Sequence, residues 1–384
     1  MDNLLNNEYY NKLGVRRVIN CASYLTMLGG SIMPTEVLEA MDKASEWFVD
    51  MKELNIAAGE VIAKFTGAEA GLVTAGAASG LMLQTAACMT GTDPRKIDQL
   101  PDTKGLKNEF IIHRSHKTNY DHNYRNAGAK LIEIGNTGGT HTWELESNIN
   151  EKTAGIIYVY GPKQNGSISI EKVIEIAHKN NIPVIVDAAA LLPPIENLMK
   201  FTNLGADLVA FSGGKGLRGP QSTGILCGKK ELINAAYLNS APNNEGIGRV
   251  SKVSKEEIIG LITALELFID RDHASIMKKW EKDCELIINS INNNVKKKDQ
   301  LQTKGIEVGH IFYFGDKYSI AIAPGPGEVI MSREYNVITI LNKDKPVNLI
   351  ELIGLINGAI YICLLYTSDA ADEGLGVDLG GRRI

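Results

Sequence analysis

The segment DLVAFSGGKGLRGPQSTG, residues 207–224, decides the fold. It opens with an apolar run that suits a strand covered on both faces, as in a parallel sheet. The run ends at Ser212, and two glycines then precede Lys215. Glycines on both sides of this lysine let a ligand approach the backbone closely. In a partly desolvated pocket the lysine would have a lowered pKa and could form a Schiff base, whereas at a solvated turn it would have no such role.

A carboxylate ends a second apolar run, PVIVD, at residues 183–187. Asp187 and Lys215 are separated by one strand–helix–strand step, so we expect both side chains to face the same crevice. An alternative role for Asp187 is to cap the next helix.

An acid and a lysine at neighbouring strand ends form the arrangement that pyridoxal phosphate requires. The acid keeps the pyridine nitrogen protonated, so that the ring accepts electrons, and the lysine holds the aldehyde as an imine. The sequence therefore predicts that Asp187 and Lys215 hold this cofactor at the carboxyl ends of the strands.

A third segment, TAGAASG at residues 74–80, places small residues at the start of an apolar helix. The backbone N–H groups of Gly76, Ala77 and Ala78 could therefore bind a phosphate, assisted by the helix dipole. Ser212 could donate to the same phosphate. Small residues are also common at helix starts that bind nothing, so this motif is weak by itself.

Three histidines and an aspartate occur together in HRSHKTNYDH, residues 113–122. The spacing H-x-x-H differs from the i, i+4 spacing of a helical zinc pair, and no cysteine lies nearby. We therefore expect no metal site. We expect His116 to stack on the cofactor ring, and the alternative is that these are loop histidines without a role.

Substrate contacts are expected close to Lys215 and near the N-terminus. Arg218 could bind a carboxylate or phosphate through two hydrogen bonds, or it could form a structural ion pair. Weaker candidates for substrate contacts are Gln221, Arg17, Asn20 and Tyr24.

Apolar strand-like runs alternate with helical patterns through the middle of the chain, which predicts an α/β fold. The expected strands are Phe110–His113, Lys130–Ile134, Gly155–Tyr160, Pro183–Asp187, Asp207–Ser212 and Gly224–Cys227. The expected helices are 37–48, 80–89, 170–180 with Ser169 as its N-cap, 255–270 opened by a capping box, and 274–292. Mainly strand-like runs follow, at 306–314, 318–323, 337–341 and 359–363, which suggests a separate α+β lobe.

These patterns divide the chain into four expected parts. They are an N-terminal arm with substrate contacts (1–35), a large cofactor-binding α/β domain (36–250), a small α+β domain (251–363) and a tail (364–384). The tail, LLYTSDAADEGLGVDLGGRRI, has no helical or strand period and resembles translated sequencing-adapter sequence. A natural disordered tail is the alternative.

The composition excludes several classes of function. The 384 residues carry a net charge of −5, so the chain has no overall electrostatic attraction to nucleic acid or to an anionic membrane. Its five cysteines are scattered without a C-x-x-C pair, which is typical of a reducing compartment. No apolar run approaches the length of a membrane span. We therefore expect a cytoplasmic protein.

Together these segments resemble fold-type-I pyridoxal-phosphate enzymes of the selenocysteine synthase-like group, which includes D-glucosaminate-6-phosphate ammonia lyases. The resemblance covers about residues 10–363. It rests on the segments RVIN (17–20), LGGS (28–31), TAGAA (74–78), VDAAA (186–190) and FSGGKGLRGPQ (211–221), and on His116 with Tyr120-Asp121. It implies a mostly parallel seven-stranded sheet, a smaller α+β lobe, and a homodimer or larger ring with active sites at subunit interfaces. The resemblance implies that Lys215 forms the imine with the cofactor, that Asp187 pairs with the pyridine nitrogen, and that Gly76–Ala78 hold the phosphate.

The resemblance implies a lyase that removes water and ammonia from a small amino acid or a phosphorylated amino-sugar acid, leaving a 2-oxo acid. In this reaction Lys215 would act as general base. An aminotransferase or a selenocysteine synthase-like transferase is the nearest alternative, and a cofactor-free α/β binding protein is a further one. Because the balance of charge is acidic, we expect a small-molecule amino substrate and no nucleic acid partner.

Overall fold

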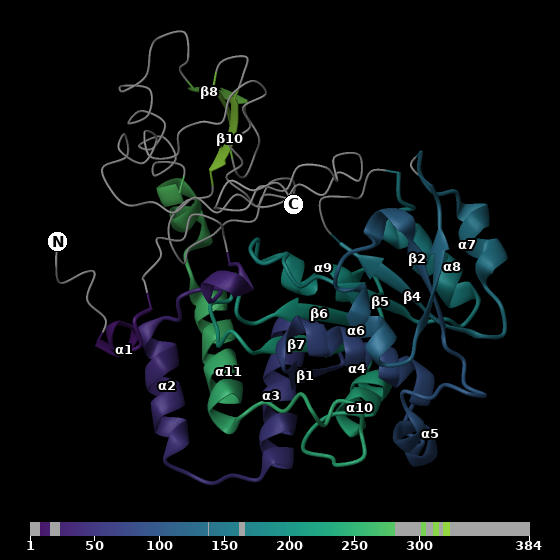
Figure 1. Cartoon of the computed structure of the whole chain (residues 1–384), viewed down its shortest axis with the longest axis horizontal. Helices are drawn as coiled ribbons and strands as arrows, with labels where there is room; N and C mark the ends of the chain where they lie inside the picture. The colour runs from purple at the N-terminus through teal and green to yellow at the C-terminus, as the bar shows by residue number, and fades with distance from the viewer. Residues whose placement is uncertain are drawn as a thin grey trace.

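A seven-stranded sheet forms the centre of the computed structural model of this protein (Figure 1). Its strand order is β1-β7-β6-β5-β4-β2-β3, and β7 runs antiparallel to its two neighbours while the other pairs are parallel. The mostly parallel α/β architecture expected from the sequence is therefore confirmed. The residues that the structure describes are 8–15, 24–136, 138–160, 166–280, 301–304, 310–314 and 318–322.

The strands of this sheet are short and, except for the edge strand β3, almost wholly buried, as the apolar runs predicted. Their bounds are β1 Ala70–Thr74, β2 Glu109–His113, β3 Lys130–Ile134, β4 Thr153–Val159, β5 Val184–Asp187, β6 Leu208–Ser212 and β7 Gly224–Gly228. The sequence did not predict β1. Its residues AGLVT contain two small residues and lie directly before the small-residue helix start, which hides the strand signal.

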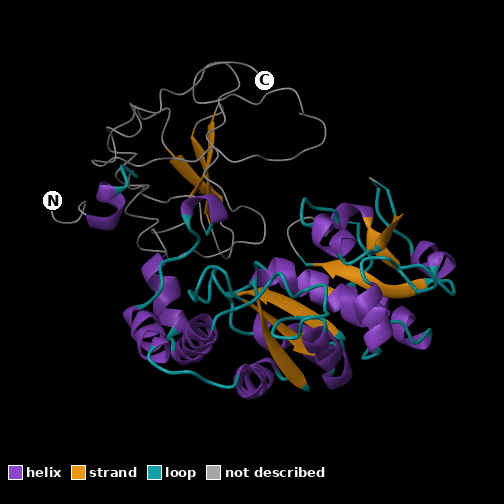
Figure 2. Cartoon of the chain, turned by 60° about the horizontal axis from the view of Figure 1, so that its bottom comes forward, coloured by secondary structure: helices purple, strands orange, loops and turns teal. Residues whose placement is uncertain are grey.

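Helices cover both faces of the sheet, because alternate strand residues point to opposite sides. One core cluster joins the sheet to α3 (Met51–Thr66), α8 (Ile170–Lys179), α9 (Asn197–Asn203) and α11 (Lys255–Asp270). A second cluster joins the other face to α4 (Gly76–Thr90), α6 (Asp121–Asn126) and α10 (Lys230–Leu238). The result is a three-layer sandwich, seen from a second side in Figure 2.

The remaining elements are short or lie at the margins of the sandwich. They are α1 Glu8–Lys12, α2 Thr35–Ser45, α5 Pro94–Gln99, α7 Thr142–Asn148, two 3-10 turns at Thr26–Leu28 and Arg114–His116, and an antiparallel sheet of β8 Leu301–Lys304, β9 His310–Phe314 and β10 Tyr318–Ile322. Residues 273–280 are also helical.

Local signals set the helix boundaries where the sequence contains clear caps. Ser254 accepts a hydrogen bond from the Glu257 N–H, and the Glu257 carboxylate accepts one from the Ser254 N–H, which completes the predicted capping box of α11. Ser169 caps α8 as predicted. The helix expected over 37–48 ends instead at Ser45, and Phe48 lies beyond it, fully exposed.

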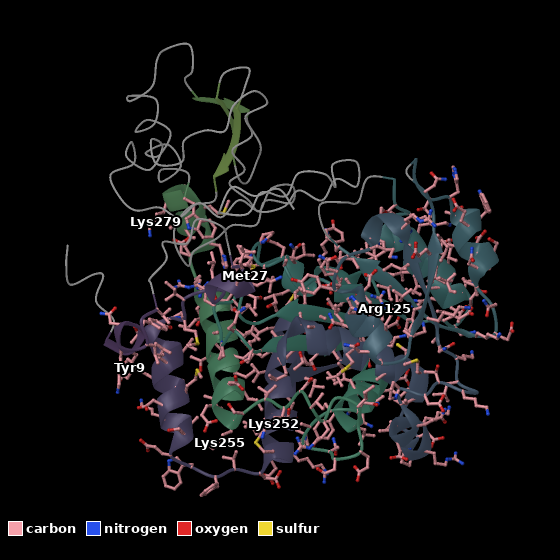
Figure 3. The ribbon with its side chains drawn as sticks, in the orientation of Figure 1. Tyr9, Met27, Arg125, Lys252, Lys255 and Lys279 are labelled. Atoms are coloured by element: carbon pink, nitrogen blue, oxygen red, sulfur yellow. The ribbon has the colours of Figure 1, made fainter. Side chains whose placement is uncertain are left out.

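Helix α11 packs against α2 and α3, so it belongs to the same helical layer as α3 (Figure 1). In Figure 3, Lys255 lies at the N-terminal end of α11 and Met27 lies near its C-terminal end. Phe268 in the last turn of α11 and Arg271 directly after it line a cavity with Lys215, so the C-terminal end of α11 reaches the segment that follows β6.

The four-part division of the chain stays a prediction. The second half of the expected helix 274–292, the expected strands 337–341 and 359–363, and the tail lie outside the described residues. Within the described residues, every helix is too short or too polar to cross a membrane.

The contact between α3 and β1 gives a test of packing. A Cβ on Gly59 would lie 2.3 Å from the carbonyl oxygen of Gly71, so the helix and strand approach each other at this glycine. We expect Gly59→Ala to lower the free energy of unfolding by about 1–3 kcal/mol, although alanine is the better helix former. The change would be measured by urea unfolding, with Gly138→Ala as control, because there the added Cβ would meet only the end of the Asn136 side chain. An unchanged or higher stability for Gly59→Ala would contradict this packing.

Candidate functional site

The largest group of predicted site residues lines one cavity at the carboxyl ends of the parallel strands. The pairing of β5 with β6 sets Asp187 opposite Ala210, so the residues that follow β6 start beside the Asp187 carboxyl group. The cavity has a volume of about 390 Å³. The predicted residues that line it are Gly76, Ala77, Ala78, Asp187, Ser212, Lys215 and Gln221.

Burial acts on the two ionisable groups of this cavity in opposite directions. Loss of solvation raises the pKa of Asp187, a shift opposed by a hydrogen bond from the Ala189 N–H at 3.0 Å and by the charge of Lys215. Loss of solvation lowers the pKa of Lys215, and the Asp187 charge opposes it. Their attraction is not a direct contact, since these two described side chains form no ion pair within 4.0 Å. Lys215 is therefore more easily made neutral than a surface lysine.

The N-terminal end of α4 supplies backbone donors to the same cavity. Gly76 has a φ of +73°, which favours glycine, and Ala75 gives the helix no side-chain cap. The first N–H groups of a helix lack intrahelical partners, and they lie at the positive end of the helix dipole. Gly76–Ala78 are therefore suited to binding an anionic group such as phosphate.

A glycine in β7 lets this helix start come close to the sheet. Gly224 pairs with both Thr74 and Ser212, and a Cβ at Gly224 would lie 2.5–2.7 Å from backbone atoms of Gly76 and Ala77. The close approach places the α4 N-terminus next to the end of β6.

His116 lies outside the residues that line the cavity. It is buried, with its ring centroid 4.6 Å from that of His113 and 4.6 Å from that of Tyr158. Burial lowers the pKa of His116 to about 3, and the proximity of His113 adds to the shift, so the imidazole is neutral. Within the described residues, neither ring nitrogen of His116 has a hydrogen-bond partner. The stacking of His116 on a cofactor stays a prediction.

The same segment contributes two cavity residues: Thr118, which the sequence did not single out, and Tyr120, which supported the resemblance but was given no role. Tyr160 and Asn197 were also missed and line the cavity from the end of β4 and the start of α9. Lys200 donates a hydrogen bond to the Tyr160 hydroxyl at 2.8 Å and lies 4.4 Å from the centre of its ring. Only the position of Tyr160, as the last residue of the predicted strand 155–160, could have identified it.

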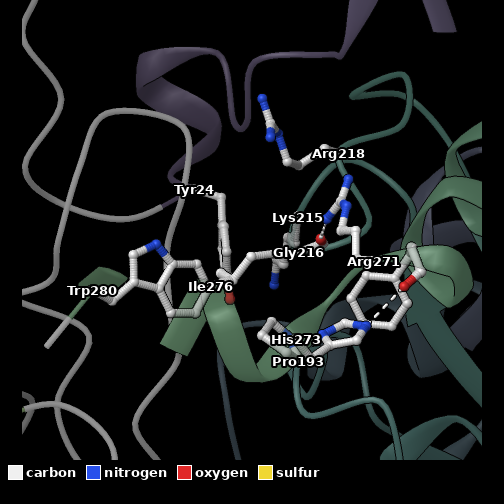
Figure 4. Close-up of a pocket in the computed structure, with 10 residues that line it drawn as sticks. Tyr24, Pro193, Lys215, Gly216, Arg218, Arg271, His273, Ile276 and Trp280 are labelled. Atoms are coloured by element: carbon white, nitrogen blue, oxygen red, sulfur yellow. Dashed lines mark hydrogen bonds between the residues drawn. The ribbon is translucent and has the colours of Figure 1, made fainter. Parts of the chain in front are cut away.

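A second, smaller cavity of about 40 Å³ lies on another side of Lys215 (Figure 4). Tyr24 and Arg218, both predicted substrate contacts, line it. The Tyr24 hydroxyl donates to the Leu192 carbonyl at 3.4 Å. Arg271 and His273 also line it and were missed, because nothing in the sequence brings the end of α11 to Lys215.

The predicted contacts Arg17 and Asn20 lie outside the described residues. Gln221 lines the main cavity, and its buried side-chain oxygen has no hydrogen-bond partner within the described residues.

The main cavity fits pyridoxal phosphate in three respects. The uncapped α4 N-terminus suits the phosphate, Asp187 suits the protonated ring nitrogen, and the partly buried Lys215 suits the aldehyde. Among the described His, Cys, Asp and Glu side chains, no group of three is arranged to hold a metal ion.

Comparison with known proteins gives consistent matches. The model of the SelA family, described as L-seryl-tRNA selenium transferase, matches residues 122–303. D-glucosaminate-6-phosphate ammonia lyase of Salmonella typhimurium is 36% identical over 67% of this chain and 69% of its own length. 5'-C-glycyluridine monooxygenase-decarboxylase of a Streptomyces species is 32% identical over 67% of this chain, and this chain spans 64% of its length.

A solved structure of D-glucosaminate-6-phosphate ammonia lyase is also similar to this protein. It superimposes with a TM-score of 0.71 at 30% identity, covering 82% of this chain and 83% of that one.

The pKa values of two lysines are shifted in opposite directions, and this difference gives a test of the site. Lys229 forms an ion pair with Asp207 at 2.6 Å, and this contact raises the pKa of Lys229, whereas burial lowers the pKa of Lys215. A small amine-directed reagent attacks only the neutral amine, so we expect Lys215 to be labelled at lower pH than Lys229. Labelling across a pH series, followed by peptide mapping, measures both residues in one sample. Labelling of Lys229 at the lower pH would contradict the assigned environments.

Proposed function

Because this chain belongs to the SelA-like family of pyridoxal-phosphate enzymes, whose members include D-glucosaminate-6-phosphate ammonia lyase, we propose that it is a pyridoxal-phosphate-dependent lyase. The reaction releases ammonia from a phosphorylated amino-sugar acid and leaves a 2-oxo acid. The observation that carries the proposal is that Lys215 and Asp187, from neighbouring strand ends, line one cavity with the α4 N-terminus.

Pyridoxal phosphate, when bound, supplies a ring that accepts the electron pair left on a carbon when its proton is removed. The residues of the chain hold that ring and move the proton. The N–H groups of Gly76–Ala78 bind the phosphate, and Asp187 keeps a proton on the ring nitrogen. The raised pKa of Asp187 reflects its burial, which favours the protonated carboxyl group. A positively charged ring nitrogen beside it would favour the ionised carboxylate instead.

Lys215 acts first as the attachment point and then as the general base. Its lowered pKa supplies the neutral amine that both steps need. Once displaced by the substrate amine, Lys215 removes the proton from the carbon that carries that amine. The hydroxyl on the next carbon then leaves as water, and a returning water releases ammonia. The reaction involves no net oxidation, so it needs no acceptor keto acid.

Two measurements test this function together. Borohydride reduction of the protein loaded with pyridoxal phosphate should attach the cofactor to the peptide that contains Lys215, and Lys215→Ala should abolish the adduct while Lys229→Ala retains it. The wild type should release ammonia from D-glucosaminate 6-phosphate without added keto acid, and Lys215→Ala should lose this activity by at least about 10²-fold. An adduct on another peptide would overturn the site. Ammonia release only with an acceptor keto acid would instead support the aminotransferase.

The protein is further proposed to form a homodimer or a larger ring of identical chains. Trp47, Phe48 and Val49 follow α2, and Ile56 lies on α3; all four side chains are about half exposed or more, and Trp47 is 71% exposed. Contiguous exposed apolar side chains are typical of a protein interface. A cytoplasmic location stays a prediction from the scattered cysteines.

The molar mass of the protein, measured by light scattering as it leaves a sizing column, tests the oligomeric state. We expect a multiple of the 41.8 kDa chain mass for the wild type and a smaller species for the double variant Trp47→Ser, Phe48→Ser. Exposed Tyr9→Ser serves as control, since Tyr9 lies on α1. A monomeric wild type at micromolar concentration would contradict the proposal.

A further inference from the structure

We propose that Tyr160 donates the proton with which the substrate hydroxyl leaves as water, and that Lys200 is a positioning residue that supports Tyr160 in this role. This inference rests on the proposed function, because it names an acid for the same reaction. Lys215 removes the first proton, and the hydroxyl on the next carbon is a poor leaving group until it receives a proton. A proton donor must therefore reach this hydroxyl.

Tyr160 lies at the same edge of the sheet as Asp187, one strand further along. Strands β4 and β5 are parallel neighbours, with Val159 opposite Asp187 (Figure 1). The Tyr160 N–H donates to the Asp187 carbonyl at 3.0 Å, which fixes the backbone of Tyr160 at this edge. Tyr160 lines the main cavity together with Asp187 and Lys215. The phenol therefore belongs to the cavity in which we place the reaction.

The groups assigned to the cofactor lie on one side of the cavity, and Tyr160 lies on the other. The phosphate site is at the start of α4, which lies against Gly224 of β7. Asp187 ends β5 and Lys215 follows β6. The strand order β7-β6-β5-β4 therefore places Tyr160 on the opposite side of Asp187 from the phosphate site. A substrate that extends beyond the cofactor on this side meets Tyr160.

Tyr160 is the best acid among the described hydroxyl groups that line the cavity. These hydroxyls belong to Thr26, Thr118, Tyr120, Tyr160 and Ser212. A phenol is a far stronger acid than an aliphatic alcohol, which selects the two tyrosines. Tyr120 is 57% exposed, whereas Tyr160 is half-buried and has a cationic partner.

Lys200 supplies the charge that such an acid needs. Its Nζ donates a hydrogen bond to the Tyr160 hydroxyl oxygen at 2.8 Å and lies 4.4 Å from the centre of the ring. An ammonium group only donates, so the phenol oxygen is the acceptor in this contact. When Tyr160 gives up its proton, this oxygen becomes negative and the contact becomes an ion pair. Lys200 therefore stabilises the proton transfer more than it stabilises the neutral phenol.

Aromatic packing on α9 holds the pair in place. Phe201 is fully buried, and its ring meets the Tyr160 ring in a T-shaped arrangement with 5.1 Å between the centres. Lys200 precedes Phe201 in α9, and its Nζ lies 5.7 Å from the Phe201 ring centre. One helix therefore positions both the ring and the cation at the end of β4.

The proposed step conserves protons and electrons. Lys215 takes the proton from C2 of the substrate, and the electron pair of that bond becomes the second bond between C2 and C3 as the C3–O bond breaks. The oxygen keeps the pair of the broken bond and takes the Tyr160 proton, so water leaves. Tyr160 remains as a phenolate beside the Lys200 ammonium and regains a proton from solvent, while Lys215 returns its proton to solvent.

The test separates the loss of water from the proton removal that precedes it. The full chain is loaded with pyridoxal phosphate, and uptake is checked by visible absorption. The compounds are D-glucosaminate 6-phosphate, its 3-deoxy analogue, which has no hydroxyl to lose, and its 3-fluoro analogue, which loses fluoride without receiving a proton. Ammonia release is measured for the first and third. For the 3-deoxy analogue, binding is titrated through the cofactor absorption, and exchange of the C2 proton for deuterium is followed by NMR.

Four variants are compared with the wild type. Tyr160→Phe removes only the hydroxyl, Lys200→Gln removes the charge, and Lys200→Arg keeps a cationic donor. The control Tyr237→Phe removes a phenol hydroxyl on α10, outside the described lining of the cavity.

We expect Tyr160→Phe to release ammonia from D-glucosaminate 6-phosphate about 10²- to 10⁴-fold more slowly than the wild type, the usual effect of losing a general acid. It should bind the 3-deoxy analogue and exchange its C2 proton as the wild type does. It should also retain ammonia release from the 3-fluoro analogue. Tyr237→Phe should match the wild type in every measurement.

The Lys200 variants test whether this residue acts through the phenol. Lys200→Gln should slow ammonia release from D-glucosaminate 6-phosphate, and Lys200→Arg should retain most of the rate, because a guanidinium also donates to the phenol oxygen. The double variant Tyr160→Phe, Lys200→Gln should be no slower than Tyr160→Phe. Losses that multiply in the double variant would overturn the role given to Lys200.

Ammonia release by Tyr160→Phe at the wild-type rate would overturn the proposal and leave the proposed function intact. Equal losses of ammonia release and of C2 exchange would also overturn it, because Tyr160 would then act before water leaves. Should Tyr160→Phe take up no cofactor, Lys200→Gln decides, and unchanged release by that variant would overturn the proposal. If the wild type releases no ammonia, the proposed function fails first, and this inference fails with it.

Discussion

The pairing of β5 with β6 is the constraint on which the site depends. In this register Asp187 is the last residue of its strand and lies opposite Ala210, two residues before the end of β6. The chain then needs only Gly213 and Gly214 to bring Lys215 into the same cavity. A shift of one residue in this pairing would turn Asp187 to the opposite face of the sheet, because side chains alternate along a strand. The buried apolar residues on both faces of β5 and β6 hold the register, so the packing of the core also fixes the chemistry.

Burial explains why the two ionisable groups can work together without a direct ion pair. A closely paired lysine and aspartate would each be stabilised in the charged form, and the lysine would then be a poor nucleophile. Here loss of solvation lowers the pKa of Lys215 and raises that of Asp187, and their mutual attraction opposes both shifts only in part. Asp187 and Lys215 line one cavity of about 390 Å³, in which the carboxyl group would hold the ring nitrogen of the cofactor and the amine would hold its aldehyde. The shared burial of Asp187 and Lys215 in one cavity therefore accounts for a neutral lysine beside a carboxyl group.

The sequence predicted the sheet well because its strands follow local patterns. Buried parallel strands appear as continuous apolar runs, and the residues at their ends, Asp187, Ser212 and Lys215, line one cavity. The errors arose where local patterns carry little information. The small residues of β1 hid a strand, and Phe48, although apolar, lies beyond the end of its helix. The role of His116 at the cofactor stays a prediction, and its segment contributes Thr118 and Tyr120 to the lining of the cavity. Arg271 and His273 could not be found, since they reach Lys215 only through the packing of α11 against α2 and α3.

The strand ends of the large sheet and the end of α11 contribute different groups to the region around Lys215. The strand ends of the large sheet hold groups suited to the phosphate, the ring nitrogen and the aldehyde, and these requirements are shared by every reaction of the family. Substrate choice needs groups that can vary without disturbing the sheet. The end of α11 meets this need, because Phe268 in its last turn and Arg271 directly after it line a cavity with Lys215 from outside the sheet. Side chains at the end of α11 can therefore differ between relatives while Lys215 and Asp187 keep their places at the strand ends.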